Sequence, residues 1–212
     1  MIRINKKKKN GYIDITVKSI NNGHHQVSYR GVKAIRCPFD YLIYQMIISE
    51  IKPDLIIEIG TRKGGGAYYL ADLLESIGHG VVHTIDIVDE VEPTVKAHNR
   101  IKFFTNGWAG YDLNLASGFD KIMIIEDASH LYEDTIGILN KFHGLVTVGS
   151  YFIVEDGIVN ELGFENKYNG GPLRAIREFV PNHQEYIVDR KWCDMFGINA
   201  TFNVDGYLKK IK

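Results

Sequence analysis

This 212-residue chain has little cysteine, almost no excess of charge of either sign and no long apolar run. Its two cysteines, Cys37 and Cys193, have no metal-type spacing and fit a reducing cytoplasm, with one long-range disulfide as the open alternative. The stretch from Tyr41 to Ile48 is apolar apart from Gln45, but it is far too short to span a bilayer. Met1 is not followed by the apolar stretch of a signal peptide. We therefore expect a cytoplasmic protein without a membrane segment.

The charge balance also bears on the kind of partner. The formal net charge is −1, which argues against a general nucleic-acid binder. The basic run from Lys6 to Lys9 has no aromatic residues between its lysines, so we interpret it as a solvated N-terminal tail. We expect a small-molecule or glycan partner instead, with a homo-oligomer left open.

Hydrophobic periodicity predicts strands that alternate with helices, and the near-continuous apolar runs indicate strands buried on both faces of a parallel sheet. The predicted strands are 55–59, 81–87, 101–105, 121–125, 150–154, 185–188 and 203–209. The predicted helices are 38–52, 66–77, 111–116, 131–143 and 172–179, with a loop over 157–171. Two short strands, 12–17 and 26–29, bracket the predicted turn Asn21–Gly23. We expect one domain over 38–212, preceded by these strands and a tail over 1–37.

The most informative stretch runs from Asp54 to Gly66, with the sequence DLIIEIGTRKGGG. It predicts a buried strand, a glycine-rich turn and a helix N-terminus, an arrangement that holds nucleotide-like cofactors. A dinucleotide-binding turn needs glycine two residues after Gly60, where this chain has Arg62. A cofactor without phosphates, such as S-adenosylmethionine, tolerates the turn, because its carboxylate can lie near the helix amides and the charges of Arg62 and Lys63. An ordinary turn without a ligand is the alternative.

Polar residues also follow the next two predicted strands. Asp86 lies where a carboxylate can accept both ribose hydroxyls of an adenosine, unless it only caps a turn. Asn106 and Trp108 can flank an adenine ring, although a buried indole is as often mere packing. The cofactor-binding residues that we expect are Glu58, Gly60, Thr61, Arg62, Gly64, Gly65, Asp86, Asn106, Gly107, Trp108 and Asp127.

Acidic residues end two further strands, with Asp127 after the fourth and Glu155 and Asp156 after the fifth. If these strands are neighbours, their ends lie roughly 5 Å apart and the like charges conflict. A divalent cation removes the conflict, and hard oxygen ligands favour Mg²⁺ or Mn²⁺, with Ca²⁺ as an alternative. Helix caps or pairs with lysine and arginine are the other interpretation. His130 is a candidate general base near this site, whereas the other histidines lie in no such constellation.

Six segments carry a resemblance to a known family. They are Tyr29–Asp40, Lys52–Gly60, Gly64–Gly65, Asp127–His130, Val148–Asp156 and Gly171–Phe179. Together they resemble the cephalosporin hydroxylase family, over roughly residues 28 to 210, and its relatives include rhamnosyl O-methyltransferases. Many relatives carry Gly-Asp where this chain has Asn106-Gly107, a departure that affects the expected adenine contacts.

The resemblance implies a Rossmann-like class I methyltransferase fold: a mostly parallel seven-stranded sheet with helices on both faces and an antiparallel C-terminal edge hairpin. It also implies a Mg²⁺ site of Asp127, Glu155 and Asp156. The expected reaction is methyl transfer from S-adenosylmethionine to a hydroxyl of a sugar or small natural product. Asp127 and His130 are the expected catalytic residues, with a bound water as the alternative base.

Three rival functions remain at the level of sequence. An NAD-linked oxidoreductase would use the same sheet, but Arg62 replaces the glycine that its turn needs. A metal-dependent hydrolase would keep the acids without an adenosine site. A catalytically silent S-adenosylmethionine-binding module would keep Gly60 and Asp86 without a filled metal site.

Overall fold

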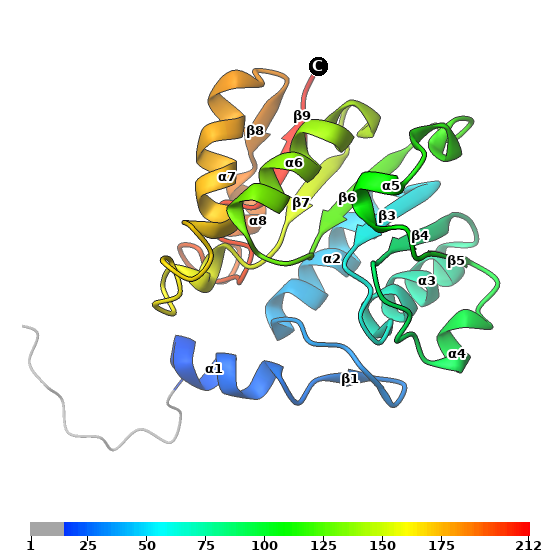
Figure 1. The fold of residues 1–212 in the computed structure, drawn as a ribbon, viewed down its shortest axis with the longest axis horizontal. Helices are drawn as coiled ribbons and strands as arrows, with labels where there is room; N and C mark the ends of the chain where they lie inside the picture. The colour runs from blue at the N-terminus through cyan, green and yellow to red at the C-terminus, as the bar shows by residue number, and fades with distance from the viewer. Residues whose placement is uncertain (1–14) are drawn as a thin grey trace, which may run out of the picture.

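A seven-stranded sheet forms the centre of the molecule in the computed structural model, which describes residues 15–212 (Figure 1). The strand order is β5-β4-β3-β6-β7-β9-β8. The strands are β3 (Leu55–Ile59), β4 (Val81–Ile85), β5 (Ile101–Phe104), β6 (Ile122–Glu126), β7 (Tyr151–Val154), β8 (Tyr186–Val188) and β9 (Tyr207–Lys210). The strands β3 to β7 pair in parallel, whereas β9 is antiparallel to both β7 and β8. The predicted mostly parallel sheet with an antiparallel edge hairpin is confirmed.

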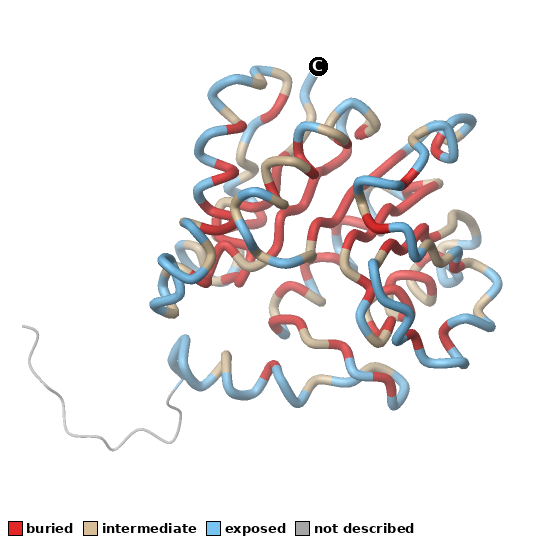
Figure 2. Tube along the Cα trace, viewed as in Figure 1, coloured by how far each residue is buried: buried red, intermediate tan, exposed pale blue. Residues whose placement is uncertain are grey.

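Helices cover both faces of this sheet, and the central strands β3, β6 and β7 are buried at every residue (Figure 2). On one face, α2 (Pro38–Ile51), α3 (Gly65–Ile77) and α8 (Arg190–Cys193) pack on alternate strand residues such as Ile56. On the other face, α6 (Tyr132–Phe142) and α7 (Gly171–Phe179) pack on the residues between them, such as Ile57. The remaining elements of this part are α4 (Pro93–Lys96), α5 (Gly107–Gly110) and the 3₁₀ turns η1 (Leu113–Ala116), η2 (His143–Leu145), η3 (Gly157–Val159) and η4 (Val180–Asn182).

Local sequence explains where α2 begins and ends. Pro38 occupies its first turn, where the missing N–H costs no intrahelical hydrogen bond. Lys52 closes the helix in the left-handed conformation, at φ 52°, and Pro53 follows. Cys37 at its start and Cys193 are buried free thiols, so they form no disulfide with each other.

The N-terminal prediction needs correction. The expected strand 12–17 falls partly on residues 1–14, which lie outside the described residues together with the lysine run. Within the described part, α1 (Val17–His24) is a helix that includes the predicted turn Asn21–Gly23. The expected strand 26–29 is shorter, as β1 (Ser28–Tyr29) pairs with β2 (Val32–Lys33) in a small hairpin.

The strand order reverses between β3 and β6. The chain proceeds outward from β3 through β4 to β5, then returns to β6 on the other side of β3. In open α/β sheets, ligands bind at the carboxyl ends of the strands beside such a reversal. Among the described helices, none is long and apolar enough to cross a membrane.

Candidate active site

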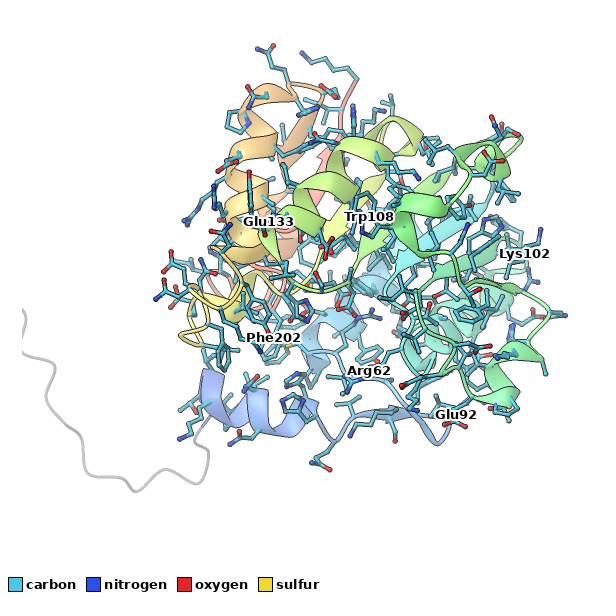
Figure 3. All side chains as sticks on the ribbon, viewed as in Figure 1. Arg62, Glu92, Lys102, Trp108, Glu133 and Phe202 are labelled. Atoms are coloured by element: carbon cyan, nitrogen blue, oxygen red, sulfur yellow. The ribbon has the colours of Figure 1, made fainter. Side chains whose placement is uncertain are left out.

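A cavity of about 600 Å³ opens at the carboxyl ends of β3, β4 and β6, within the usual range for small-molecule sites. Arg62, from the turn after β3, and Trp108, from α5, both line it and are labelled in Figure 3. Acidic side chains from the ends of β4, β6 and β7 line it as well. The N-terminal segment adds another wall, through His24, His25 and residues 33–36.

The glycines after β3 let backbone segments approach one another closely. Gly60 has φ +104°, and a Cβ there would lie 1.8 Å from the carbonyl oxygen of Asp127. A Cβ on Gly65 would lie 2.2 Å from the carbonyl oxygen of Lys33. Gly64 is the left-handed N-cap of α3 and provides no side-chain cap. Gly60 therefore lets the end of β3 pack against the end of β6, and Gly65 lets α3 pack against the N-terminal segment. Gly64 leaves the N-terminus of α3 without a side-chain acceptor.

Asp86 organises the turn after β3. Its Oδ2 accepts the backbone N–H groups of Thr61 at 2.9 Å and Arg62 at 2.8 Å. Its Oδ1 accepts those of Ile87 at 2.7 Å and Val88 at 3.2 Å. These four hydrogen bonds give the turn-capping alternative a structural basis, and Asp86 also lines the cavity.

The residues after β5 divide into two groups. Gly107 and Trp108 line the cavity. Asn106 does not: its amide donates to the carbonyl of Gly110 at 2.6 Å. Gly64 is also outside the lining, since it packs against Val91 and Val95.

A buried guanidinium links the acids of three strand ends. Arg36 is 4% exposed, and it contacts Glu155 twice, with Nε 3.0 Å from Oε2 and NH2 2.7 Å from Oε1. NH2 also lies 3.5 Å from Glu58 Oε1 and 3.6 Å from Asp127 Oδ2. Glu155 accepts a further hydrogen bond from Tyr44 Oη at 2.7 Å. Glu155, proposed from sequence as a metal ligand, is therefore engaged by Arg36 and Tyr44.

Burial shifts the titration of the acids around this guanidinium. The pKa of Glu58 rises to about 7 because its carboxyl group is buried, although Arg36 and the Thr84 hydroxyl at 2.7 Å oppose the rise. The pKa of Asp127 is held well above its ordinary value by burial and by repulsion from Glu155 and Asp156. Such an acid gains from a nearby cation, so the donor set fits a divalent metal ion.

Asp127, His130 and Asp156 form a compact cluster of ligand atoms. One ligand atom from each lies within 4.8 Å of the other two. His130 Nε2 lies 3.4 Å from Asp156 Oδ2. Both His130 and Asp156 have positive φ, 61° and 57°, a backbone region that residues other than glycine adopt uncommonly. The structure thus gathers Asp127, Asp156 and His130, with Glu155 outside the cluster.

The sequence pattern did not indicate several residues of the site. Arg36 lies within a segment that carried the family resemblance, but nothing in the pattern indicated its acidic partners. His24 and His25 line the cavity because α1 brings them there. Glu126 is buried beneath the cluster, and burial raises the pKa of its carboxyl group to about 8. Its position at the end of a buried strand was the one available signal.

Comparison with known proteins agrees with the predicted resemblance. Residues 21–211 match the family model described as Rhamnosyl O-methyltransferase/CmcI. The rhamnosyl O-methyltransferase of Mycobacterium leprae (strain TN) is 28% identical over 202 residues, covering 85% of this chain and 82% of that protein. The protein of the same name from Mycobacterium tuberculosis (strain ATCC 25618 / H37Rv) is 27% identical over 179 residues, covering 78% and 72%.

Solved structures show the same fold. The structure described as cmcI-N160 SAH has a TM-score of 0.68 at 20% identity, covering 88% of this chain and 83% of that one. The structure described as cmcI-D160 Mg-SAM has a TM-score of 0.65 at 22% identity, with 89% and 78% covered. The expected class I methyltransferase fold is therefore confirmed. Because the family model spans nearly all of the described residues, this chain belongs to the Rhamnosyl O-methyltransferase/CmcI family.

Proposed function

We propose that this chain is an S-adenosylmethionine-dependent O-methyltransferase that uses Mg²⁺ or Mn²⁺ and acts on a hydroxyl of a sugar or small natural product. The observation that carries the proposal is one cavity that joins the glycine turn after β3 to the cluster of Asp127, His130 and Asp156. A methyl donor and an acceptor must meet in a single pocket for direct transfer. The family and the names of its mycobacterial relatives support the same reaction.

The cofactor side of the cavity is the turn after β3. We assign the donor's carboxylate to the N-terminus of α3, near Gly65 and Arg62, because the free helix amides and the guanidinium attract an anion. Asp86 faces the ribose, and Gly107 and Trp108 line the position of the adenine. Glu58 and Thr61 also line this wall, whereas Gly64 shapes it from outside the lining.

The reaction side is formed by the ends of β6 and β7. When bound, S-adenosylmethionine supplies an electrophilic methyl group, and the divalent ion supplies charge that lowers the pKa of an acceptor hydroxyl. Asp127 and Asp156 would hold the ion, while Glu155 keeps Arg36 in place beside them. His130 Nε2, 3.4 Å from Asp156, accepts the proton of the acceptor hydroxyl.

The acceptor wall favours a polyhydroxylated molecule. His24, His25, Ser129 and Asp134 line the cavity beside His130 and offer donors and acceptors for hydroxyl groups. Two adjacent hydroxyls would satisfy both the ion and these side chains. A sugar therefore suits the site, as the names of the relatives also suggest.

The test separates cofactor binding from transfer. We expect isothermal titration to give similar affinities of wild type and Asp127→Asn for S-adenosylhomocysteine. Transfer from labelled S-adenosylmethionine to a rhamnoside should fall about 100-fold or more in Asp127→Asn, since the charge that holds the ion is lost. Asp112→Asn removes an acid that caps η1 outside the cavity, so it serves as the matched control with full activity.

Two results would contradict the proposal at different points. Absence of any S-adenosylhomocysteine binding to wild type would remove the methyl donor and leave a metal-dependent hydrolase as the alternative. Full transfer in the presence of EDTA would remove the metal while leaving the methyltransferase intact.

A further inference from the structure

A second cluster of metal-ligating side chains lies outside the catalytic cavity. His143, His183 and Glu185 each place one ligand atom within 4.8 Å of the other two. Among the described residues, this cluster and the catalytic one are the two such groups. It joins segments far apart in the sequence, since His143 follows α6 while His183 and Glu185 lie between η4 and β8.

The cluster lies at the rim of the sheet opposite to the catalytic cavity. The helix α6 starts beside the carboxyl end of β6 and runs back toward the amino ends of the strands, where His143 closes it. Because β8 and β7 are both antiparallel to β9, β8 runs in the same direction as β7, and Glu185 precedes its first residue. In Figure 1, α6, α7 and β8 form one side of the molecule. The two clusters are therefore independent.

The imidazoles are already oriented for ligation. His183 Nδ1 lies 2.9 Å from the carbonyl oxygen of Phe179, to which it can only donate, so Nε2 retains its free lone pair. Such a hydrogen bond from the second nitrogen is typical of metal-bound histidines. The His183 ring stacks on that of Phe179 with 3.7 Å between centroids. His143 Nδ1 lies 3.5 Å from Glu185 Oε1, and the two imidazole centroids are 4.7 Å apart.

The backbone around these side chains is held by hydrogen bonds. The buried Tyr186 donates its N–H to the carbonyl of His183 at 2.9 Å and its hydroxyl to the carbonyl of His143 at 2.6 Å. The N–H of Ile211 donates to the carbonyl of Glu185 at 2.8 Å. One tyrosine thus connects two of the ligands, and the terminal residues of the chain fix the third. Little ordering is needed for an ion to bind.

We propose that His143, His183 and Glu185 bind a divalent transition-metal ion of the Zn²⁺ class. Two imidazoles and a carboxylate suit Zn²⁺, whereas Mg²⁺ prefers oxygen ligands alone. The side chains of His143 and Glu185 are each 31% exposed and His183 is partly exposed, so water can complete the coordination. Lys210 Nζ contacts the carbonyl of His143 at 3.4 Å and opposes a further cation, so we expect a dissociation constant on the order of micromolar.

An ion at this place would join the end of α6, the turn η4 and the start of the edge strand β8. Since the unfolded chain does not hold these three ligands together, binding would raise the free energy of unfolding. The site is therefore structural in character. Its effect on methyl transfer at the opposite rim should be small.

The experiment must first exclude Zn²⁺ binding at the catalytic cluster. We use Asp156→Asn as the background, because it removes one ligand of that cluster. Equilibrium dialysis against Zn²⁺ in excess Mg²⁺ should give one bound ion per chain in this background. Adding His183→Gln should weaken Zn²⁺ binding at least tenfold. When Co²⁺ replaces Zn²⁺, the variant should lack the visible absorption of a four-coordinate Co²⁺ ion.

The matched control is His79→Gln in the same background. His79 also faces a carboxylate, with Nε2 3.8 Å from Asp54 Oδ1, but within residues 15–212 it belongs to no group of three ligating side chains. Its substitution should leave Zn²⁺ binding unchanged. If His183→Gln fails to fold by circular dichroism, Glu185→Gln replaces it, with the same expected loss.

Unchanged Zn²⁺ affinity in His183→Gln, or in Glu185→Gln where that variant replaces it, would overturn the inference. Binding is measured without methyl donor or acceptor, in a background that disables the catalytic cluster. The outcome is thus separate from that of the proposed methyl transfer, and either can fail alone.

Discussion

Gly60 follows β3 and packs against the backbone of Asp127, which follows β6. Its φ of +104° is a conformation that side-chain-bearing residues rarely adopt, and the Asp127 carbonyl fills the space that a Cβ would need. The same Asp127 belongs to the catalytic cluster. Because Gly60 has no Cβ, the turn after β3 can pack directly against the backbone of Asp127.

We expect Gly60→Ala to lower the free energy of unfolding by about 2–5 kcal/mol. About 1–2 kcal/mol comes from the positive φ, and about 1–3 kcal/mol comes from the overlap with the Asp127 carbonyl. Urea unfolding of the two proteins measures the difference. Transfer activity should fall with it, since the carbonyl and the side chain of Asp127 move together.

Gly118→Ala is the control for this prediction. Gly118 has φ +90° but no atom within 4 Å of a Cβ, so its substitution carries the backbone strain without the overlap. It should lose about 1–2 kcal/mol and keep full activity. Equal losses at the two glycines would show that the close approach of β3 and β6 is not the cause.

Single residues also show how far the sequence could predict the site. Gly60, Asp86 and Asp127 could be located because each follows a recognisable buried strand. The pairing of Arg36 with Glu155 could not, since the two residues are 119 positions apart and no local pattern connects them. Such pairing depends on which strands become neighbours, and a single sequence does not specify it.

Among the elements, α1 shows why the N-terminal prediction was wrong. Thr16 accepts the N–H of Ser19 at 3.0 Å, and Ser19 Oγ accepts the N–H of Thr16 at 2.9 Å. This reciprocal capping box starts a helix, although the apolar alternation of residues 12–17 is typical of a strand. The capping signal was present in the sequence, but Asn21–Gly23 suggested a turn.

The cap leads to a prediction for α1. Thr16→Ala should cost about 1 kcal/mol of local stability, because the N–H of Ser19 loses its acceptor. Hydrogen–deuterium exchange over 17–24 should become about fivefold faster, which corresponds to that energy. Thr16→Ser keeps the hydroxyl and should exchange like wild type. If Thr16→Ser exchanges as fast as Thr16→Ala, the capping hydroxyl does not hold the helix.

Length decides which other elements the sequence could reveal. The long helices α2, α3 and α6 were predicted almost in full because each presents several turns of apolar spacing. The helices α4 and α8 have four residues each, too few to show a period, and both were missed. The last strand begins at Tyr207 rather than at residue 203, because Asn203 is buried and bonded to the hydroxyls of Tyr44 and Tyr207.

In the whole molecule, a buried basic group and a buried acidic group make the free energy of unfolding depend on pH. His83 is 1% exposed, with Nδ1 2.6 Å from the Tyr111 hydroxyl, and burial lowers its pKa to about 4. Asp40 is fully buried, and burial raises its pKa to about 7, although it accepts hydrogen bonds from Thr201, Phe202 and Tyr207. The two groups act in opposite directions on stability.

The unfolded chain binds a proton on His83 below about pH 6.5, whereas the folded chain does so only below about pH 4. The stability that neutral His83 provides is therefore complete above pH 6.5 and decreases as pH falls toward 4. For Asp40, stability is complete below about pH 4, where both states are protonated, and decreases as pH rises toward 7. Each slope is at most about 1.4 kcal/mol per pH unit.

We expect His83→Gln and Asp40→Asn to change the pH profile of unfolding with opposite signs. Between about pH 4 and 6.5, the stability of His83→Gln relative to wild type should improve as pH falls, because only wild type then loses the contribution of a neutral imidazole. Over about pH 4 to 7, Asp40→Asn should improve relative to wild type as pH rises. Urea unfolding at closely spaced pH values measures both slopes, which are independent of the constant loss that each substitution causes. Profiles parallel to that of wild type would mean that His83 and Asp40 titrate alike in the folded and unfolded chain, and that their burial does not control the charge of either group.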